Sequence, residues 1–220
     1  EMKVIGINGS PRKQWNTATL VSEALKGAAT VGATTEIIHL YDLDFKGCQS
    51  CFACKKREGK SYGKCVVKDD LEPVLEKIAA ADALVVGSPI YFGMVTGETR
   101  SFLERLLFPY FTYTVPYGTL LPRNIKTAFI YTMNVPEELS KELGYEYIFN
   151  SSERFTQLVL GDAETLCAYD TCQVDDYSKL MIESFDPAYK AKRREEALPL
   201  ECKRAFALGQ RLVGSTSVGV

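Results

Sequence analysis

Short apolar segments alternate along this chain with segments whose apolar residues recur at helical spacing. Strands that alternate with helices predict a parallel sheet with helices on both faces. The segment 81–87, which is apolar apart from Asp82, fits a strand that is buried on both sides. With five such strands, we predict a doubly wound α/β fold with strand order 2-1-3-4-5, formed by one domain over residues 1–220. The five predicted strands cover residues 2–7, 34–40, 81–87, 126–132 and 163–169.

Length, charge and histidine content narrow the set of functions that the chain could have. The 220 residues suffice for one sizeable core, and 26 Lys and Arg against 28 Asp and Glu give a formal net charge of −2. Without a basic face, we expect no nucleic acid partner. No apolar run reaches the ~18 residues of a membrane span and no signal peptide precedes the first strand, so we expect a cytoplasmic protein without a membrane partner. The one histidine, His39, falls in a predicted strand, so histidine acid–base catalysis is not expected.

A polar loop over residues 7–17 joins the first predicted strand to the first predicted helix. Amide groups at a helix N-terminus favour an anion, and the loop adds the guanidinium of Arg12 and three uncharged polar side chains. These features predict a phosphate-binding loop, and the alternative is an ordinary strand–helix turn. The dinucleotide pattern G-x-G-x-x-G is absent, and residues 59–61 match only the tail of a triphosphate P-loop. The uncharged polar side chains are Ser10, Asn16 and Thr17.

Two more unusual loops, 88–97 and 132–136, follow the third and fourth predicted strands. In a doubly wound sheet, ligands bind beyond the carboxyl ends of the strands, where these loops meet the loop at 7–17. Tyr91 and Phe92 offer flat surfaces, and Gly93 lets backbone approach a ligand closely. A planar ring with a phosphate tail therefore fits this edge. The alternative is that the two aromatic side chains pack in the core.

The two motifs Gly9-Ser10-Pro11-Arg12 with Asn16-Thr17, and Gly87-Ser88-Pro89-Ile90-Tyr91-Phe92-Gly93, resemble the NADPH-dependent FMN reductase family of flavodoxin-like proteins. The resemblance covers residues 3–135, and the remainder fits only as a topology. It implies a flavodoxin-like fold, FMN as cofactor and NAD(P)H as reductant. The loop at 133–136 departs from the glycine-rich loop of many family members. The implied FMN contacts are Ser10, Arg12, Asn16, Thr17, Ala18, Pro89, Ile90, Tyr91, Phe92, Gly93, Met133 and Asn134.

Four of the seven cysteines crowd into an insert over residues 45–68, as Cys48-x2-Cys51-x2-Cys54-x10-Cys65. Two-residue spacings let thiolates from one loop converge on a metal centre, so we expect metal or redox chemistry rather than a disulfide scaffold. The motif resembles that of the iron–sulfur flavoproteins, a branch of the same family, although the last gap is longer here. The resemblance implies a [4Fe–4S] cluster on these four cysteines. The alternatives are a structural zinc and a relic loop with reduced thiols.

These features predict an FMN-dependent oxidoreductase that passes electrons from a nicotinamide nucleotide through the flavin to free flavin, a quinone or a protein. The flavin performs the chemistry, so no catalytic side chain is predicted. The alternatives are a non-enzymatic flavodoxin-like electron carrier and a metal-binding regulatory module without flavin. The aromatic stretch 108–122 is predicted to be an ordered loop or interface, and we expect a homodimer or homotetramer in which a second subunit covers the ring. A helical extension over 186–214, interrupted at Pro199, is predicted to end the fold.

Overall fold

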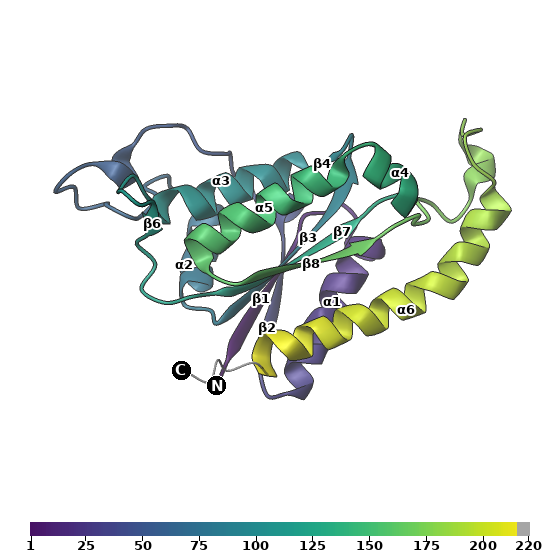
Figure 1. The fold of residues 1–220 in the computed structure, drawn as a ribbon, viewed down its shortest axis with the longest axis horizontal. Coiled ribbons are helices and arrows are strands. Elements are labelled where there is room, and N and C mark those ends of the chain that lie inside the picture. Colours follow the sequence, from purple (N-terminus) through teal and green to yellow (C-terminus); the bar gives the residue numbers. More distant parts are fainter. Residues whose placement is uncertain (215–220) are drawn as a thin grey trace.

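A computed structural model describes residues 1–214 as a parallel sheet with helices on both faces (Figure 1). Short 3-10 turns lie at Leu40–Asp42, Ala53–Lys55 and Tyr177–Lys179. The strands are β1 (Lys3–Asn8), β2 (Thr34–His39), β3 (Ala83–Tyr91), β4 (Met94–Val95), β5 (Phe111–Thr112), β6 (Gly118–Thr119), β7 (Lys126–Thr132) and β8 (Ala163–Ala168). The helices are α1 (Asn16–Thr30), α2 (Leu71–Ala79), α3 (Gly97–Tyr110), α4 (Glu137–Glu142), α5 (Tyr145–Leu160) and α6 (Pro187–Gly214).

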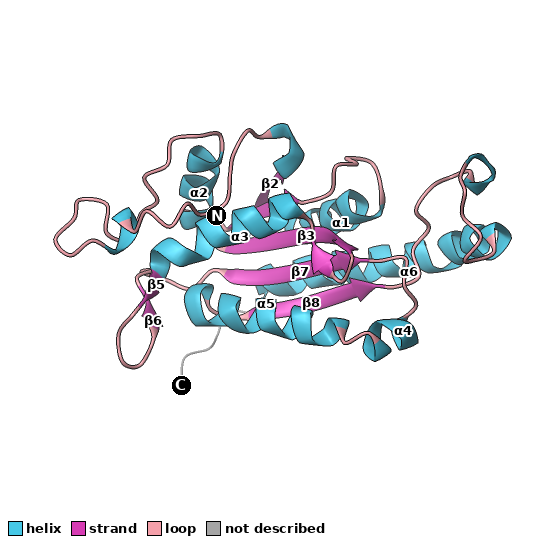
Figure 2. Ribbon diagram, turned by 90° about the horizontal axis from the view of Figure 1, so that it is seen from above, coloured by secondary structure: helices cyan, strands magenta, loops and turns pink. Residues whose placement is uncertain are grey.

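The five long strands lie in the order β2-β1-β3-β7-β8, and every pairing between them is parallel. When the two-residue strands are left out, this order reads 2-1-3-4-5. The sheet differs from the prediction by a sixth strand, β4, which pairs antiparallel with the end of β3. Because the long strands are parallel, their carboxyl ends and the loops that follow them lie along one edge of the sheet (Figure 2).

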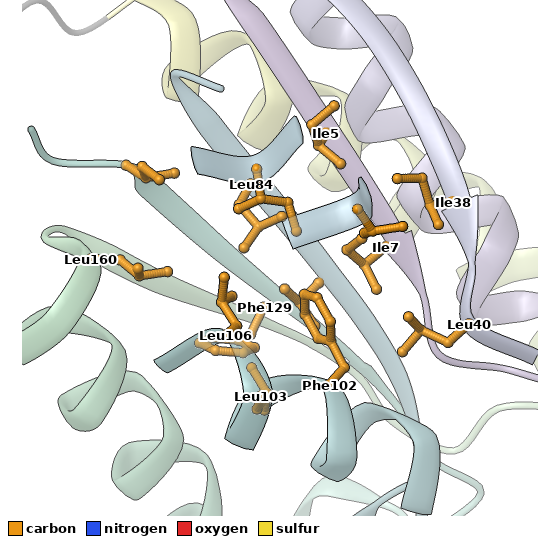
Figure 3. Packing of buried hydrophobic residues seen from close by; sticks show 14 of the residues in the cluster. Ile5, Ile7, Ile38, Leu40, Leu84, Phe102, Leu103, Leu106, Phe129 and Leu160 are labelled. Atoms are coloured by element: carbon orange, nitrogen blue, oxygen red, sulfur yellow. The ribbon is translucent and has the colours of Figure 1, made fainter. Parts of the chain in front are cut away.

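Two apolar cores hold the layers together, one on each face of the sheet. On one face, Phe102 and Leu106 of α3 pack against strand residues that include Ile7 and Phe129 (Figure 3). On the other face, α1 and α6 cover the sheet, as Figure 1 shows. Hydrophobic burial of this kind is the main favourable term in folding. None of the described helices is long and apolar enough to cross a membrane.

Helices α1 and α6 approach each other so closely that glycine is required at two contacts. A Cβ atom on Gly27 would lie 2.0 Å from the carbonyl oxygen of Phe206. A Cβ atom on Gly209 would lie 1.8 Å from the carbonyl oxygen of Ala24. Both distances are far inside van der Waals contact, so only glycine allows this packing of α6.

Several local features differ from the sequence-based prediction. Residues 88–97 do not form a free loop, because β3 continues to Tyr91 and turns through Phe92 and Gly93 into β4. The aromatic stretch 108–122 instead extends α3 to Tyr110 and then forms the β5–β6 hairpin.

The helix break predicted at Pro199 is wrong, whereas a break does occur elsewhere, at Gly144. Gly144, with φ of 74°, separates α4 from α5. Helix α6 runs without a break through Pro199, although an interruption was predicted there. The buried positions Ala197, Glu201 and Ala205 flank Pro199, and their packing outweighs the hydrogen bond that proline removes.

Candidate functional site

The three loops predicted to form a ligand site are joined by hydrogen bonds at the carboxyl edge of the sheet. The Gly9 amide donates to the Gly87 carbonyl at 2.8 Å, which links the loop after β1 to β3. The Thr96 hydroxyl donates to the Gly9 carbonyl at 2.8 Å. The hydroxyl groups of Thr17 and Thr132 lie 2.8 Å apart and bond to each other. The edge is therefore one connected surface rather than three separate turns.

The loop over residues 7–17 keeps its polar side chains close to the N-terminus of α1. Ser10, Asn16 and Thr17 are buried, whereas Arg12 is exposed. The first turn of α1 contains no acidic residue and its N-cap makes no side-chain hydrogen bond, so the positive end of the helix dipole has no anionic partner there. Ala18 is buried inside α1 and offers only its backbone to a ligand. This arrangement suits a phosphate group.

The β3–β4 hairpin places aromatic side chains at the surface beside this loop. Phe92 is fully exposed and Tyr91 is 46% exposed, so the alternative that they pack in the core is wrong. Phe92 has φ of 51° and Gly93 has φ of 80°, as in a two-residue type I′ turn. A positive φ is unusual for a bulky residue, and such strain clusters at ligand sites. Pro89 and Ile90 are half-buried and lead into the turn.

The third loop contributes a buried amide whose oxygen lacks a partner. Met133 is buried, and Oδ1 of Asn134 is buried with no hydrogen-bond partner in the part of the chain that the structure describes. An unpaired buried acceptor costs free energy, so a ligand with an N–H group at this edge would satisfy it. The donor and acceptor atoms at this edge therefore fit a flavin nucleotide.

The segment after β8 also belongs to this edge, which the sequence analysis missed. Both Trp15 Nε1 and Asn16 Nδ2 donate to the Cys172 carbonyl, at 3.1 Å and 2.8 Å. Arg194 of α6 donates to Asn16 Oδ1 at 3.0 Å, and Arg12 donates to the carbonyl of Gln173. The sequence did contain a signal for this segment. A fifth strand that is parallel to the others must also end at the carboxyl edge, so the residues after it lie there too.

A buried ionic cluster fixes α6 to the third loop. Lys190 is 2% exposed, forms an ion pair with the buried Asp170 and donates to the Asn134 carbonyl at 2.9 Å. The hydroxyl of Tyr189 donates to Asp170 at 2.6 Å. Further along α6, burial raises the pKa of the Glu201 carboxyl, which Arg193 opposes. These contacts hold the start of α6 beside the candidate site.

The insert over residues 45–68 lies at the other end of the molecule, as Figure 2 shows by the strand arrows that point away from it. All four of its thiols line one small cavity of about 20 Å³ against α3. Within residues 1–214, no group of three or more Cys, His, Asp or Glu side chains is arranged to hold a metal ion. Four thiols around one space suit a metal centre chemically, but their side chains must rearrange to bind one. The four are Cys48, Cys51, Cys54 and Cys65.

Arg105 joins the insert to α3. Its side chain is 1% exposed, and its Nε–H donates to Cys65 Sγ at 3.1 Å. Its two terminal nitrogens bond to both carboxylate oxygens of Asp69, at 2.8 Å and 3.0 Å. Burial acts to raise the pKa of Asp69, but the bonds from Arg105 outweigh it and keep that pKa below its ordinary value. Burial also raises the pKa of the Cys54 thiol.

The fold and the carboxyl edge of the sheet together define the class of protein. The chain is a doubly wound α/β protein with a loop suited to an anion and, beside that loop, a flat aromatic surface. A family model described as NADPH-dependent FMN reductase matches residues 2–117. The chain belongs to this family.

The chain is similar to several iron–sulfur flavoproteins. It is 43% identical to one from Methanocaldococcus jannaschii over 104 residues, which are 47% of this chain and 51% of that protein. It is 44% identical to one from Archaeoglobus fulgidus over 104 residues, which are 47% of this chain and 48% of that protein. The matched region thus spans about half the length of these curated relatives.

Solved structures share the fold over nearly the whole chain. An NAD(P)H:quinone oxidoreductase from Methanothermobacter marburgensis superposes with a TM-score of 0.71 at 16% identity, covering 96% of this chain and 99% of that one. An azoreductase from Bacillus anthracis superposes with a TM-score of 0.65 at 16% identity, covering 96% of this chain and 100% of that one. At such identities the likeness establishes the fold alone.

Proposed function

We propose that this chain is an FMN-dependent oxidoreductase to which a reduced nicotinamide nucleotide supplies electrons and from which free flavin, a quinone or a protein removes them. The observation that supports this best is the hydrogen-bonded edge, where an uncompensated helix N-terminus lies beside exposed aromatic rings and an unpaired buried amide oxygen. FMN, when bound, supplies the redox chemistry, and the protein binds and orients it.

Each group of residues at the edge has a binding role in this proposal. Amides and hydroxyls at the start of α1 hold the phosphate, and the guanidinium of Arg12 neutralises its charge. The hairpin presents a flat surface to the ring, and Asn134 offers its amide to the outer edge of the ring. The proposed contacts are Ser10, Arg12, Asn16, Thr17, Ala18, Pro89, Ile90, Tyr91, Phe92, Gly93, Met133 and Asn134.

The test is FMN affinity measured on the parent and on Arg12→Ala with Thr17→Ala. The double variant removes the charge and one buried hydroxyl from the proposed phosphate loop, so we expect its affinity to fall at least tenfold, a free-energy loss of ~1.4 kcal/mol. Lys13→Ala is the matched control, because Lys13 lies in the same loop but pairs with Asp42. Unchanged affinity in the double variant would show that the phosphate lies elsewhere.

Steady-state oxidation of NADH and of NADPH separates the enzyme from the electron carrier. A flavin reductase oxidises at least one of the two nucleotides when a quinone or free flavin is present. A chain that binds FMN but oxidises neither nucleotide would instead be the flavodoxin-like carrier. The two outcomes are distinguished by absorbance at the reduced nicotinamide band.

We propose further that the insert cysteines hold a [4Fe–4S] cluster. The support is a donor set of four thiols around one cavity, together with relatives whose names describe them as iron–sulfur flavoproteins. Iron, sulfide and zinc analysis of anaerobically purified protein tests this. Zinc without iron would favour a structural zinc site, and the absence of both metals would favour a relic loop. Cys202→Ser on α6 is the control for serine variants of Cys48, Cys51, Cys54 and Cys65.

A further inference from the structure

We propose that Arg105 is a positioning residue that holds Cys65 toward the other three insert thiols. The proposal rests on the four-cysteine site proposed above and assigns a role to a residue outside the cysteine motif. Arg105 lies on α3, and its guanidinium reaches three separate parts of the insert region at Lys46, Cys65 and Asp69. One buried side chain thus fastens both ends of the insert to a rigid helix.

The position of Cys65 needs such a device, because local spacing does not supply it. Cys48, Cys51 and Cys54 follow one another at two-residue gaps, so one short stretch of backbone presents all three. Cys65 comes after a further ten residues. Ordering a loop of that length costs conformational entropy, and the buried ion pair with Asp69 helps to offset that cost.

The geometry requires arginine rather than lysine. The guanidinium has five N–H donors in a planar fork. One edge of this fork makes two bonds to the Asp69 carboxylate, while Nε–H donates to Cys65 Sγ and Nη1 also donates to the Lys46 carbonyl at 2.9 Å. An ammonium group is a single point on a flexible stem and cannot keep the carboxylate pair and the sulfur contact at once. Arg105→Lys therefore keeps the charge and loses the geometry.

Cobalt binding measures the thiol site without relying on enzyme activity. Co²⁺ is titrated anaerobically into metal-free protein, and the thiolate-to-cobalt absorption band reports occupancy. We expect Arg105→Lys to weaken Co²⁺ binding roughly 10- to 100-fold, which is the usual effect of losing a residue that orients a metal ligand. Arg100→Lys is the matched control, because Arg100 lies on the same helix but is exposed and pairs with Glu104. The control should bind Co²⁺ like the parent.

A double-variant cycle distinguishes positioning from general support of the fold. If Arg105 acts through Cys65, Arg105→Lys should have little further effect in a Cys65→Ser background. An equal loss in both backgrounds, or equal binding by Arg105→Lys and Arg100→Lys, would overturn the proposal. If the parent itself shows no thiolate–cobalt band, the four-cysteine site is what fails, and the role of Arg105 fails with it.

FMN affinity and far-ultraviolet circular dichroism check that the variants are folded, since the flavin edge lies at the far end of α3. If Arg105→Lys does not fold, Asp69→Asn replaces it. That variant keeps Arg105 and releases one side of its fork, so we expect a smaller but measurable loss of Co²⁺ affinity. Parent-like binding by a folded Asp69→Asn would also contradict the proposal.

Discussion

Two buried threonines differ in whether the hydroxyl group has a partner. Thr127 donates to the Ile125 carbonyl at 3.1 Å, whereas Thr156 Oγ1 has no hydrogen-bond partner among the described residues. Valine has the same shape without the hydroxyl. We expect Thr127→Val to lower the free energy of unfolding by about 1 kcal/mol and Thr156→Val to raise it, because an unpaired buried hydroxyl is a cost. Urea unfolding measures both, and equal destabilisation by the two changes would contradict this.

The Glu201 carboxyl makes stability depend on pH. Burial raises its pKa above the ordinary value of 4.5, so the folded state disfavours its charged form. A raised carboxyl pKa contributes stability that is present below the unfolded pKa and lost as pH rises through the folded pKa. Glu201→Gln should therefore be more stable than the parent at pH 7 and equal to it near pH 4.

Urea unfolding at those two pH values measures the effect of Glu201→Gln. Glu195→Gln, on the exposed part of the same helix, is the control and should change stability by less than ~0.5 kcal/mol at either pH. A Glu201→Gln variant that is less stable than the parent at pH 7 would show that the ion pair with Arg193 dominates over burial.

At the scale of elements, the β3–β4 hairpin combines strain with exposure. Phe92 adopts a backbone conformation that asparagine tolerates better. We expect Phe92→Asn to raise the free energy of unfolding by about 1 kcal/mol and to weaken FMN binding, because relief of strain comes with loss of the ring. Phe92→Tyr keeps the ring and should change neither quantity. Thermal unfolding and FMN titration check both effects, and undiminished FMN affinity in Phe92→Asn would remove Phe92 from the proposed site.

Helix α6 depends on its glycine contact with α1. Gly209→Ala places a methyl group against the backbone of α1, so we expect a loss of about 2 kcal/mol or more in the free energy of unfolding. FMN affinity should fall too, since α6 carries Arg194 onto Asn16. Gly214→Ala on the same helix meets nothing within 4 Å and should be neutral or mildly stabilising. A neutral Gly209→Ala would mean that the two helices can separate without cost.

Elements with a clear period could be predicted from the sequence, and elements built by distant contacts could not. The strand predicted at 81–87 is apolar apart from Asp82 near its start, so its buried place in the sheet was evident. The turn at Phe92 and Gly93 lacks the Asn-Gly or Asp-Gly pair that usually marks a two-residue hairpin, so β4 was missed. The continuity of α6 through Pro199 depends on packing against α1, which no local pattern reports.

At the scale of the whole molecule, α3 connects the two candidate sites. Thr96 at its start accepts a hydrogen bond from the Thr99 amide and donates to the Gly9 carbonyl at the carboxyl edge of the sheet, where we propose that flavin binds. Arg105 holds the insert eight residues beyond Gly97, or about 12 Å along the helix axis. The motifs themselves were evident in the sequence. The distance between the two motifs in space was not evident. The insert has no periodicity, and it is placed by the contact between Cys65 and Arg105, which are forty residues apart in the chain.

The exposed aromatic residues near the insert bear on the predicted homodimer or homotetramer. Phe52, Tyr113 and Tyr117 are exposed at the end of α3 that lies away from the proposed flavin site. They therefore cannot cover a ring bound at the edge of their own chain. If these residues cover the ring, they must cover the ring of a second copy of the chain. The oligomeric state stays a prediction, which sedimentation equilibrium can test.

Trp15 is the one tryptophan in the sequence, and two guanidinium groups flank its indole ring. The guanidinium carbon of Arg194 lies 4.1 Å from the ring centroid and that of Arg12 lies 4.8 Å away. Because Arg12 belongs to the proposed phosphate loop and Arg194 to α6, indole emission depends on both elements being in place. The protein thus carries an intrinsic fluorophore at the junction of its first helix and its last. The wavelength and intensity of that emission therefore report in solution, without any added label, whether this junction is formed.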